Sequence, residues 1–351
     1  MKKNKKIIFT LLVIIIIFTA FFRIRFQENR LADYSQAQGT AFLMNTLVQI
    51  RIYGDNTEGL IDRCFEHLQD IEDRMSKTIE DSDIYKINNC QGEFVSVSDD
   101  TLQVIKKALE YAEMTEGRFD PSVGILVDLW GIGTEKARVP SLEEINTAIS
   151  KVNYNWIEIE EGKSKVRLLQ EGMKVDLGAI VKGYAADEIQ KVLEIEGISS
   201  AYINLGGNVL VMGGKPDNTP WKIGIQDPRR DKIGAIVSFE VKDKTIVTSG
   251  NYERYFEKDG AYYHHIIDPS TGYPADSGVI SASIITDDSI DADALSTCLF
   301  ILGVDKGLQL INKLDGVEAV VIKDDLGIIM TEGLQDKLIL LNNDFYFTAR
   351  K

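Results

Sequence analysis

The stretch AYINLGGNVLVM, residues 201–212, opens a series of segments rich in β-branched and aromatic residues. Segments of this kind, bounded by glycine and polar turns, are typical of β-strands. Further strands are predicted at Trp221–Gln226, Ala235–Val241, Thr245–Thr248, Tyr262–Ile267 and Val279–Ile285, followed by two short closing strands. Because the strands follow one another instead of alternating with helices, we expect an α+β fold with a largely antiparallel sheet and grouped helices.

The helical patterns lie on either side of this run of strands. Leu60–Met75 carries apolar residues at helical spacing, and another helix is predicted to start near Asp99. Ser141 and Glu144 have the spacing of a capping box ahead of a short helix. Later helices are predicted at Ala179–Leu193, Ala292–Leu302 and Lys306–Lys313.

Two other segments have less regular patterns. Phe42–Tyr53 alternates and is predicted to be one strand. Gly117–Gly133 is too rich in glycine for a helix and too apolar for an exposed loop. We expect it either to form a wall of a buried site or to line the core.

The amino terminus differs from the rest of the chain. Lys2–Lys6 precede the apolar run Ile7–Phe22, so residues 1–26 are predicted to be a membrane anchor or a cleaved signal segment. The lysines favour an amino terminus inside the cytoplasm and the rest of the chain outside it. Residues 27–39 are polar and are interpreted as a tether, and residues 40–345 as one continuous domain, because no Pro/Gly/Ser linker interrupts them.

The charge balance excludes some classes of partner. The 54 acidic and 39 basic residues give a net charge of −15. Six of the bases precede residue 27, where there is no acid, so the remainder carries 33 bases against 54 acids, or −21. Such a body repels nucleic acid, and a phosphorylated ligand would need specific cations to hold it. The three cysteines have no CxxC spacing and are interpreted as buried apolar side chains.

Several short polar stretches are candidates for chemistry. Asp293 and Thr297 lie four residues apart on one predicted helix, with Cβ atoms about 5–6 Å apart. Their oxygens suit a hard cation such as Mg²⁺, although a first-turn acid and a threonine bonded to its own helix fit equally. Lys182 follows Asp176 near the start of a helix, where it is either solvated or faces an anionic partner.

Two further signals are equally open when taken singly. His264 and His265 end a predicted strand ahead of an Asp-Pro turn, so one of them is either a proton acceptor or a hydrogen-bonded structural group. Gly206 and Gly207 interrupt a strand, as at a bulge or beside a flat ligand. Because neither a Rossmann glycine motif nor a P-loop occurs, a nucleotide would be bound by another device.

Taken together, these stretches resemble the ApbE family, the FAD:protein FMN transferases. The resemblance extends from about Met44 to Gly303 in six ordered blocks. They are MNT at residue 44, MSKT at residue 75, GRFDPSVGILVDLWGIG, VDLGAIVKGYAAD, NLGGNV, and TSGNYERY with HHIIDPSTGYP and ADALST. Their order implies a single ApbE-like, T-fold-related domain after the amino-terminal membrane helix.

The resemblance also implies an activity and its partners. FAD is the substrate, Mg²⁺ is required, and FMN passes to a Ser or Thr hydroxyl of an acceptor protein through a phosphoester bond, with release of AMP. The acceptor would be an extracytoplasmic electron-transfer subunit or an FMN-binding domain beside the cytoplasmic membrane; no nucleic acid is involved. The alternatives are a Mg²⁺-dependent FAD pyrophosphatase, which yields FMN and AMP, and a non-catalytic FAD-binding protein.

By position, the resemblance assigns roles to individual residues. The metal ligands would be the carbonyl of Ala179 and the side chains of Asp293 and Thr297, and the proton acceptor His265, with Asp176 as the second candidate. The expected FAD contacts are Met44, Thr78, Arg118, Phe119, Asp120, Asp176, Lys182 and Ile267.

Three positions depart from the family pattern. Ser296 stands where some members have an acid, so a weaker metal site is expected. Thr78 replaces a commoner tyrosine, which puts ring stacking at that point in doubt. Asn45 replaces a usual glycine and is expected to stiffen the turn beside Met44.

Overall fold

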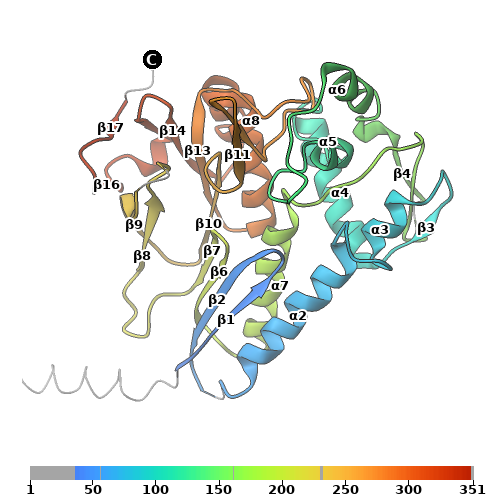
Figure 1. Ribbon diagram of the computed structural model, residues 1–351. Coiled ribbons are helices and arrows are strands. Elements are labelled where there is room, and N and C mark those ends of the chain that lie inside the picture. Colours follow the sequence, from blue (N-terminus) through green and yellow to red (C-terminus); the bar gives the residue numbers. More distant parts are fainter. Residues whose placement is uncertain (1–35, 56, 161, 230–231, 349–351) are drawn as a thin grey trace, which may run out of the picture.

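A nine-stranded sheet forms the centre of the molecule (Figure 1). The computed structural model describes residues 36–348 apart from positions 56, 161, 230 and 231. The strand order is β1-β2-β6-β7-β10-β13-β14-β15-β17, and neighbours are antiparallel except for β15 and β17. The α+β prediction is confirmed. The strands are β1 Gln36–Leu43, β2 Thr46–Tyr53, β6 Ser200–Leu205, β7 Asn208–Met212, β10 Lys244–Gly250, β13 Val279–Thr286, β14 Glu318–Lys323, β15 Gly327–Met330 and β17 Tyr346–Phe347.

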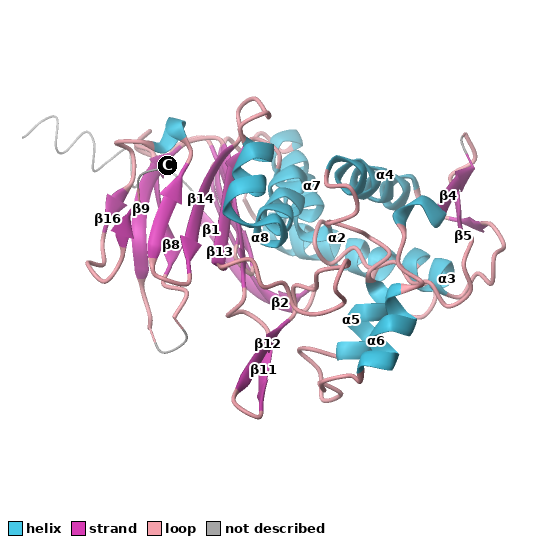
Figure 2. Ribbon diagram, turned by 90° about the horizontal axis from the view of Figure 1, so that it is seen from above, coloured by secondary structure: helices cyan, strands magenta, loops and turns pink. Residues whose placement is uncertain are grey.

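Three long helices cover one face of this sheet (Figure 2). They are α2 (Leu60–Met75), α7 (Val181–Ile195) and α8 (Ser289–Ile311). Four more helices lie beyond them, on the side away from the large sheet (Figure 2). They are α3 Asp83–Asn88, α4 Asp99–Met114, α5 Gly124–Trp130 and α6 Leu142–Ile149, followed by the 3₁₀ turn Tyr154–Trp156. A second 3₁₀ turn, Glu332–Leu334, packs against β14.

Small sheets complete the architecture. The first, ordered β16-β9-β8, packs on the opposite face of the large sheet. A second sheet, ordered β3-β5-β4, lies among the outer helices, and β11 and β12 form a separate hairpin. Their bounds are β3 Val95–Ser96, β4 Ile157–Glu160, β5 Lys165–Leu168, β8 Trp221–Gln226, β9 Ala235–Val241, β11 Tyr255–Lys258, β12 Ala261–His264 and β16 Ile339–Leu340.

Alternation along the central strands divides the apolar residues between two cores. Val247 of β10 faces the helices, whereas its neighbour Ile246 faces the β8–β9 side. In β14, Val321 and Val320 divide in the same way. Successive strand side chains point to opposite faces, so a sheet that is covered on both sides needs an apolar residue at nearly every position. A third, smaller cluster surrounds Trp130 between α5 and α6.

The amino-terminal strands differ from the prediction. Phe42–Tyr53 is not one strand, because Met44 and Asn45 both have positive φ and form the turn of the β1–β2 hairpin. Strand β1 starts at Gln36, so the predicted tether is wrong for residues 36–39. Pairing with β2 satisfies the backbone of these residues, and the site of Gly39 is tightly packed against Ile61. The predicted membrane segment, residues 1–26, lies outside the described residues.

Two glycine-rich segments also differ from the prediction. Gly117–Gly133 contains helix α5, because Gly117, Gly131 and Gly133 lie outside the helix, where each has positive φ. Gly206 and Gly207 form neither a bulge nor an interruption of one strand. They have positive φ and make the two-residue turn between β6 and β7.

Helix α8 joins the two predicted helices into one element with a kink at Gly303, whose φ of 77° is non-helical. By length and composition α8 could cross a membrane, but most of its apolar window is buried in this fold. It packs against α7, β10 and β13, as a core helix does. The predicted capping box at Ser141 and Glu144 is confirmed at the start of α6. The cysteines are free thiols, and two of them, Cys64 and Cys298, are buried.

Candidate active site

One pocket gathers residues from sequence segments that are far apart. Most of the predicted site residues line it: Met44, Arg118, Phe119, Asp120, Asp176, Ala179, Lys182, His265, Ile267, Asp293 and Thr297. The segment Gly117–Gly133 contributes a wall, as one of the two interpretations predicted. Thr78 does not line the pocket; its hydroxyl is hydrogen bonded to that of Ser76, 3.0 Å away.

The candidate cation ligands come from the starts of α7 and α8. Asp293 is only 3% exposed, and its Oδ2 accepts a 2.9 Å hydrogen bond from the amide of Gly183. In a regular helix that amide would bond to the carbonyl of Ala179. Among the described residues, no backbone amide bonds to the Ala179 carbonyl, so its oxygen is available. An alcohol, a carboxylate and a carbonyl are the hard oxygen donors that Mg²⁺ takes, so these residues fit the ion.

The close approach of α7 to α8 depends on Gly183. A Cβ atom at this position would lie 2.2 Å from the carbonyl oxygen of Ser289. Asp187, one turn further along α7, accepts hydrogen bonds from the amides of Ser289 and Ile290 at 2.7 and 2.8 Å. It therefore satisfies the first amides of α8, whose own preceding residue Asp288 makes no side-chain cap. These contacts hold Asp293 in register with the start of α7.

The carboxylate count at the cation site is low. Ser296 is fully buried, and its hydroxyl bonds to Ser249 at 2.8 Å and donates to the carbonyl of Asp293 at 2.9 Å. Among the described residues, no group of three or more His, Cys, Asp or Glu side chains is placed to hold a metal. Mg²⁺ bound through one carboxylate commonly takes substrate phosphates as further ligands.

Lys182 lies beside this cation site. Its Nζ is 3.6 Å from Oδ1 of Asp293 and 3.4 Å from the side-chain oxygen of Asn208. Asn208 belongs to the NLGGNV block and is 1% exposed, with a side-chain nitrogen that has no partner among the described residues. The lysine is thus directed into the pocket and is not simply solvated.

The two adjacent histidines have different environments. His264 is buried; its Nε2 donates to the carbonyl of Ala275 at 3.0 Å, and its Nδ1 accepts from the amide of Ile266 at 3.3 Å. Both ring nitrogens are therefore committed, and His264 is the structural one of the pair.

His265 is only partly buried and lines the pocket. Its Nδ1 is 3.3 Å from the carbonyl oxygen of Arg254. A carbonyl can only accept, so Nδ1 carries the proton and Nε2 keeps a lone pair. Burial, with help from Arg254 and His264, lowers the pKa of His265 to about 3. The imidazole is therefore neutral near pH 7, as a proton acceptor must be.

Polar partners fix the orientation of two of the predicted FAD contacts. Arg118 donates to Asp268 at 2.8 Å and to Ser270 at 2.7 Å, while its buried Nε has no partner among the described residues. The carboxylate of Asp120 accepts from the amides of Ser122 and Tyr154. Burial raises the pKa of Asp120, although these hydrogen bonds act in the opposite direction.

Asp176 is held by a cation. Its Oδ2 is 2.8 Å from Nζ of Lys77, and its Oδ1 accepts from the amide of Gly178. Lys77 also contacts Asp128 of α5 at 2.8 Å. Both carboxylate oxygens of Asp176 therefore already have partners within the protein.

Sequence reasoning missed four polar residues of the lining. Thr248, Ser249, Glu253 and Arg254 all belong to the TSGNYERY block or to the loop that follows β10. The concentration of polar residues and glycine at 248–252 was the available signal. Glu253 is exposed, yet desolvation of its carboxylate raises its pKa, while Lys182 and Arg254 act in the opposite direction.

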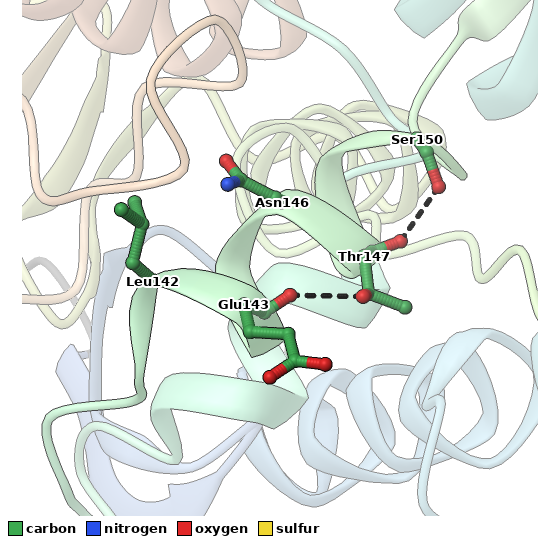
Figure 3. Close-up of a pocket in the computed structure, with 5 residues that line it drawn as sticks. All are labelled: Leu142, Glu143, Asn146, Thr147 and Ser150. Atoms are coloured by element: carbon green, nitrogen blue, oxygen red, sulfur yellow. Dashed lines mark hydrogen bonds between the residues drawn. The ribbon is translucent and has the colours of Figure 1, made fainter.

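A second hollow lies over α6 and is lined by five residues of that region, Leu142, Glu143, Asn146, Thr147 and Ser150 (Figure 3). The hydroxyls of Thr147 and Ser150 bond to carbonyls of the same helix at 2.8 Å (Figure 3). No second element contributes a converging polar group, so this hollow has no arrangement for catalysis.

Comparison with known proteins agrees with this geometry. The sequence profile described as the ApbE family matches residues 44–321. An FAD:protein FMN transferase of Treponema pallidum is 35% identical, over 90% of this chain and 91% of that protein. The ApbE protein of Thermotoga maritima aligns with a TM-score of 0.80 and 35% identity, over 86% of this chain and 99% of that one. The flavin transferase ApbE of Vibrio cholerae aligns with a TM-score of 0.77 and 28% identity, over 87% of this chain and 99% of that one.

Proposed function

The chain belongs to the ApbE family, and we propose that it acts as an FAD:protein FMN transferase. The observation that carries this proposal is the single pocket that joins His265 to Lys182 and Asp293 from three distant sequence blocks. A proton acceptor, a cation and oxygen ligands for a metal are what displacement at phosphorus requires.

The reaction proceeds by attack of a Ser or Thr hydroxyl oxygen of the acceptor protein on the FMN-side phosphorus of FAD. A bond forms between that oxygen and phosphorus, and the bond from phosphorus to the bridging oxygen breaks. AMP leaves with the bridging oxygen, and the hydroxyl proton passes to Nε2 of His265. Lys182 offsets negative charge on the diphosphate.

The residues that would hold Mg²⁺ are Ala179 through its carbonyl, Asp293 and Thr297. The bound ion would neutralise charge on the diphosphate and help to orient it. The hydrogen bond from Gly183 leaves Oδ1 of Asp293 facing Lys182, at 3.6 Å, so the carboxylate keeps an oxygen for a ligand. The predicted FAD contacts Met44, Arg118, Phe119, Asp120, Asp176 and Ile267 also line the pocket.

Residues 1–26 are the basis for the location that we propose for the reaction. Their basic and apolar pattern supports a single span or signal that places the domain outside the cytoplasm. The acceptor would then be an extracytoplasmic electron-transfer subunit or FMN-binding domain at the membrane.

A flavinylation assay tests the proposed function. The purified protein is mixed with FAD, Mg²⁺ and an acceptor domain, and the products are separated on a denaturing gel. A fluorescent acceptor band together with equimolar AMP is the expected result. Free FMN without a labelled acceptor would show that the protein hydrolyses FAD and does not transfer FMN. FAD binding with no AMP at any Mg²⁺ concentration would leave only a binding protein.

A further inference from the structure

Arg254 is a cation of the pocket without a carboxylate partner. Arg118 is paired with Asp268 at 2.8 Å, and Lys182 with Asp293 at 3.6 Å. Within the described part of the chain, no carboxylate oxygen lies within 4.0 Å of the Arg254 guanidinium. In a protein with a net charge of −15, a cation that lines a pocket without such a partner is suited to an anionic ligand.

Contacts with neutral groups orient this side chain. Its Nη2 donates to the carbonyl of Asn45, 3.0 Å away in the β1–β2 turn. Its aliphatic part lies against Gly133, where an added Cβ would be 3.4 Å from Cδ. These contacts leave Nε and Nη1 without a partner among the described residues. A guanidinium keeps a fork of donors in a fixed plane, which matches the oxygens of a phosphate.

Arg254 also lies next to the proton acceptor. In the β11–β12 hairpin Tyr255 pairs with His264, so Arg254 comes opposite His265 at the open end. The carbonyl of Arg254 accepts from the amide of His265 at 3.1 Å and from its Nδ1 at 3.3 Å. Opposite residues of antiparallel strands place their side chains on the same face, and both of these line the pocket.

From this arrangement we infer that Arg254 binds the FMN-side phosphate of FAD, the phosphate that is transferred. The inference rests on the proposed function, because it uses the position of the attacking hydroxyl at Nε2 of His265. The phosphorus must lie next to that hydroxyl, and Arg254 is the residue opposite His265. The guanidinium then offsets the charge that develops on the phosphoryl oxygens during transfer.

Two pairs of ligands separate this role from a structural one. FMN and riboflavin share the flavin ring and differ by the phosphate, and AMP and adenosine differ in the same way at the other end of FAD. Dissociation constants for all four are measured by calorimetry on the full chain at one fixed Mg²⁺ concentration. If the variant displaces the β1–β2 turn, the binding of FMN and of riboflavin should weaken alike. If it only removes a phosphate contact, the binding of FMN alone should weaken.

In the wild-type protein FMN should bind more tightly than riboflavin. Arg254→Gln should raise the dissociation constant of FMN by about 10- to 100-fold, as expected for the loss of charged hydrogen bonds. The dissociation constant of riboflavin should be nearly unchanged. Arg254→Lys keeps the charge without the fork and should fall in between. Arg63→Ala, an exposed arginine of α2 paired with Glu196, is the matched control and should change neither ligand.

Three results would overturn the inference. The first is a wild-type protein that binds FMN no more tightly than riboflavin. The second is an Arg254→Gln variant that keeps this preference for FMN. The third is a variant that loses only the preference for AMP over adenosine. Failure of the flavinylation assay with flavin binding intact would reject the proposed function instead, because these binding ratios require no turnover.

Discussion

At the scale of single residues, a hydrogen bond with the backbone decides which side-chain atom of His265 and of Asp293 stays available to a ligand. The carbonyl of Arg254 keeps the proton on Nδ1 of His265, so Nε2 keeps its lone pair. The amide of Gly183 occupies Oδ2 of Asp293, so Oδ1 is the oxygen left for a cation. Each side chain therefore has one atom held and one atom available.

Replacing the proton acceptor should separate turnover from binding. His265→Ala should lower the rate of FMN transfer by about 10²- to 10⁴-fold, the usual contribution of a general base. FAD binding, followed by quenching of flavin fluorescence, should remain close to that of the wild type. If the variant turns over at the wild-type rate, His265 is not the base and Asp176 becomes the candidate to test.

Removing the charge of Asp293 should weaken Mg²⁺ binding, so that the reaction requires more of the metal. Asp293→Asn keeps an acceptor for the Gly183 amide but loses the carboxylate charge, so more Mg²⁺ should be needed for half-maximal activity. Excess Mg²⁺ should restore part of the rate. The measurement is a titration of activity against Mg²⁺ for this variant. Asp73→Ala, a substitution at an exposed position of α2, is the control. An unchanged half-maximal concentration in Asp293→Asn would contradict the assigned role.

His265 also gives the stability of the fold a pH dependence. Its pKa is about 3 in the folded protein and about 6.5 in an unfolded chain. Between these values the unfolded state binds a proton that the folded state does not. The free energy of unfolding therefore falls as the pH is lowered through this window. Denaturant unfolding at about pH 7 and pH 4.5 should show a smaller loss for His265→Gln than for the wild type. Equal losses would show that His265 does not titrate in this way.

At the scale of elements, the active site depends on how α7 crosses α8. Gly183 permits the close approach, and Asp187 satisfies the first amides of α8. Burial raises the pKa of Asp187 to about 7, and these hydrogen bonds only partly oppose that effect. Lys182 on one helix and Asp293 on the other are thereby set at a fixed separation.

A methyl group at Gly183 should force the helices apart. Glycine to alanine inside a helix normally stabilises by about 0.5–1 kcal/mol. Here the new Cβ would meet the Ser289 carbonyl at 2.2 Å, so we expect a net loss of about 1–3 kcal/mol, as for overpacking. Urea unfolding of Gly183→Ala measures this loss, with Lys191→Ala on the exposed face of the same helix as the control. A more stable Gly183→Ala protein would show that the crossing can relax.

At the scale of the whole molecule, the central sheet joins two cores into one body. Ile246 and Val247 are neighbours in β10 but belong to different cores. The pocket lies on the side of the helices, so the β8–β9 core contributes stability without contacting the site.

Truncating a residue of the distant core should therefore destabilise the fold while sparing ligand binding. Ile246→Ala removes a side chain that is 3% exposed, and the expected cost is about 2–5 kcal/mol. Ile233→Ala is a matched control, because that side chain is fully exposed and should contribute little. Thermal unfolding and FAD binding below the transition give both quantities. A large loss of FAD affinity in folded Ile246→Ala would show that the two cores are coupled through the sheet.

The sequence alone determined the α+β class, most of the elements and eleven residues of the pocket lining, because strand alternation, helical spacing and ordered motifs are local properties of the chain. It assigned Thr78 to the FAD contacts, although Thr78 does not line the pocket, and it missed Arg254 and Glu253. It also excluded a helix from the glycine-rich segment that contains α5. Those points depend on contacts between residues distant in sequence. Only the tertiary structure decided which nitrogen of His265 is free, which oxygen of Asp293 is held, and which cation of the pocket forms no ion pair among the described residues. A hydrogen bond across 110 positions, such as that from Gly183 to Asp293, leaves no periodic trace in the chain that forms it.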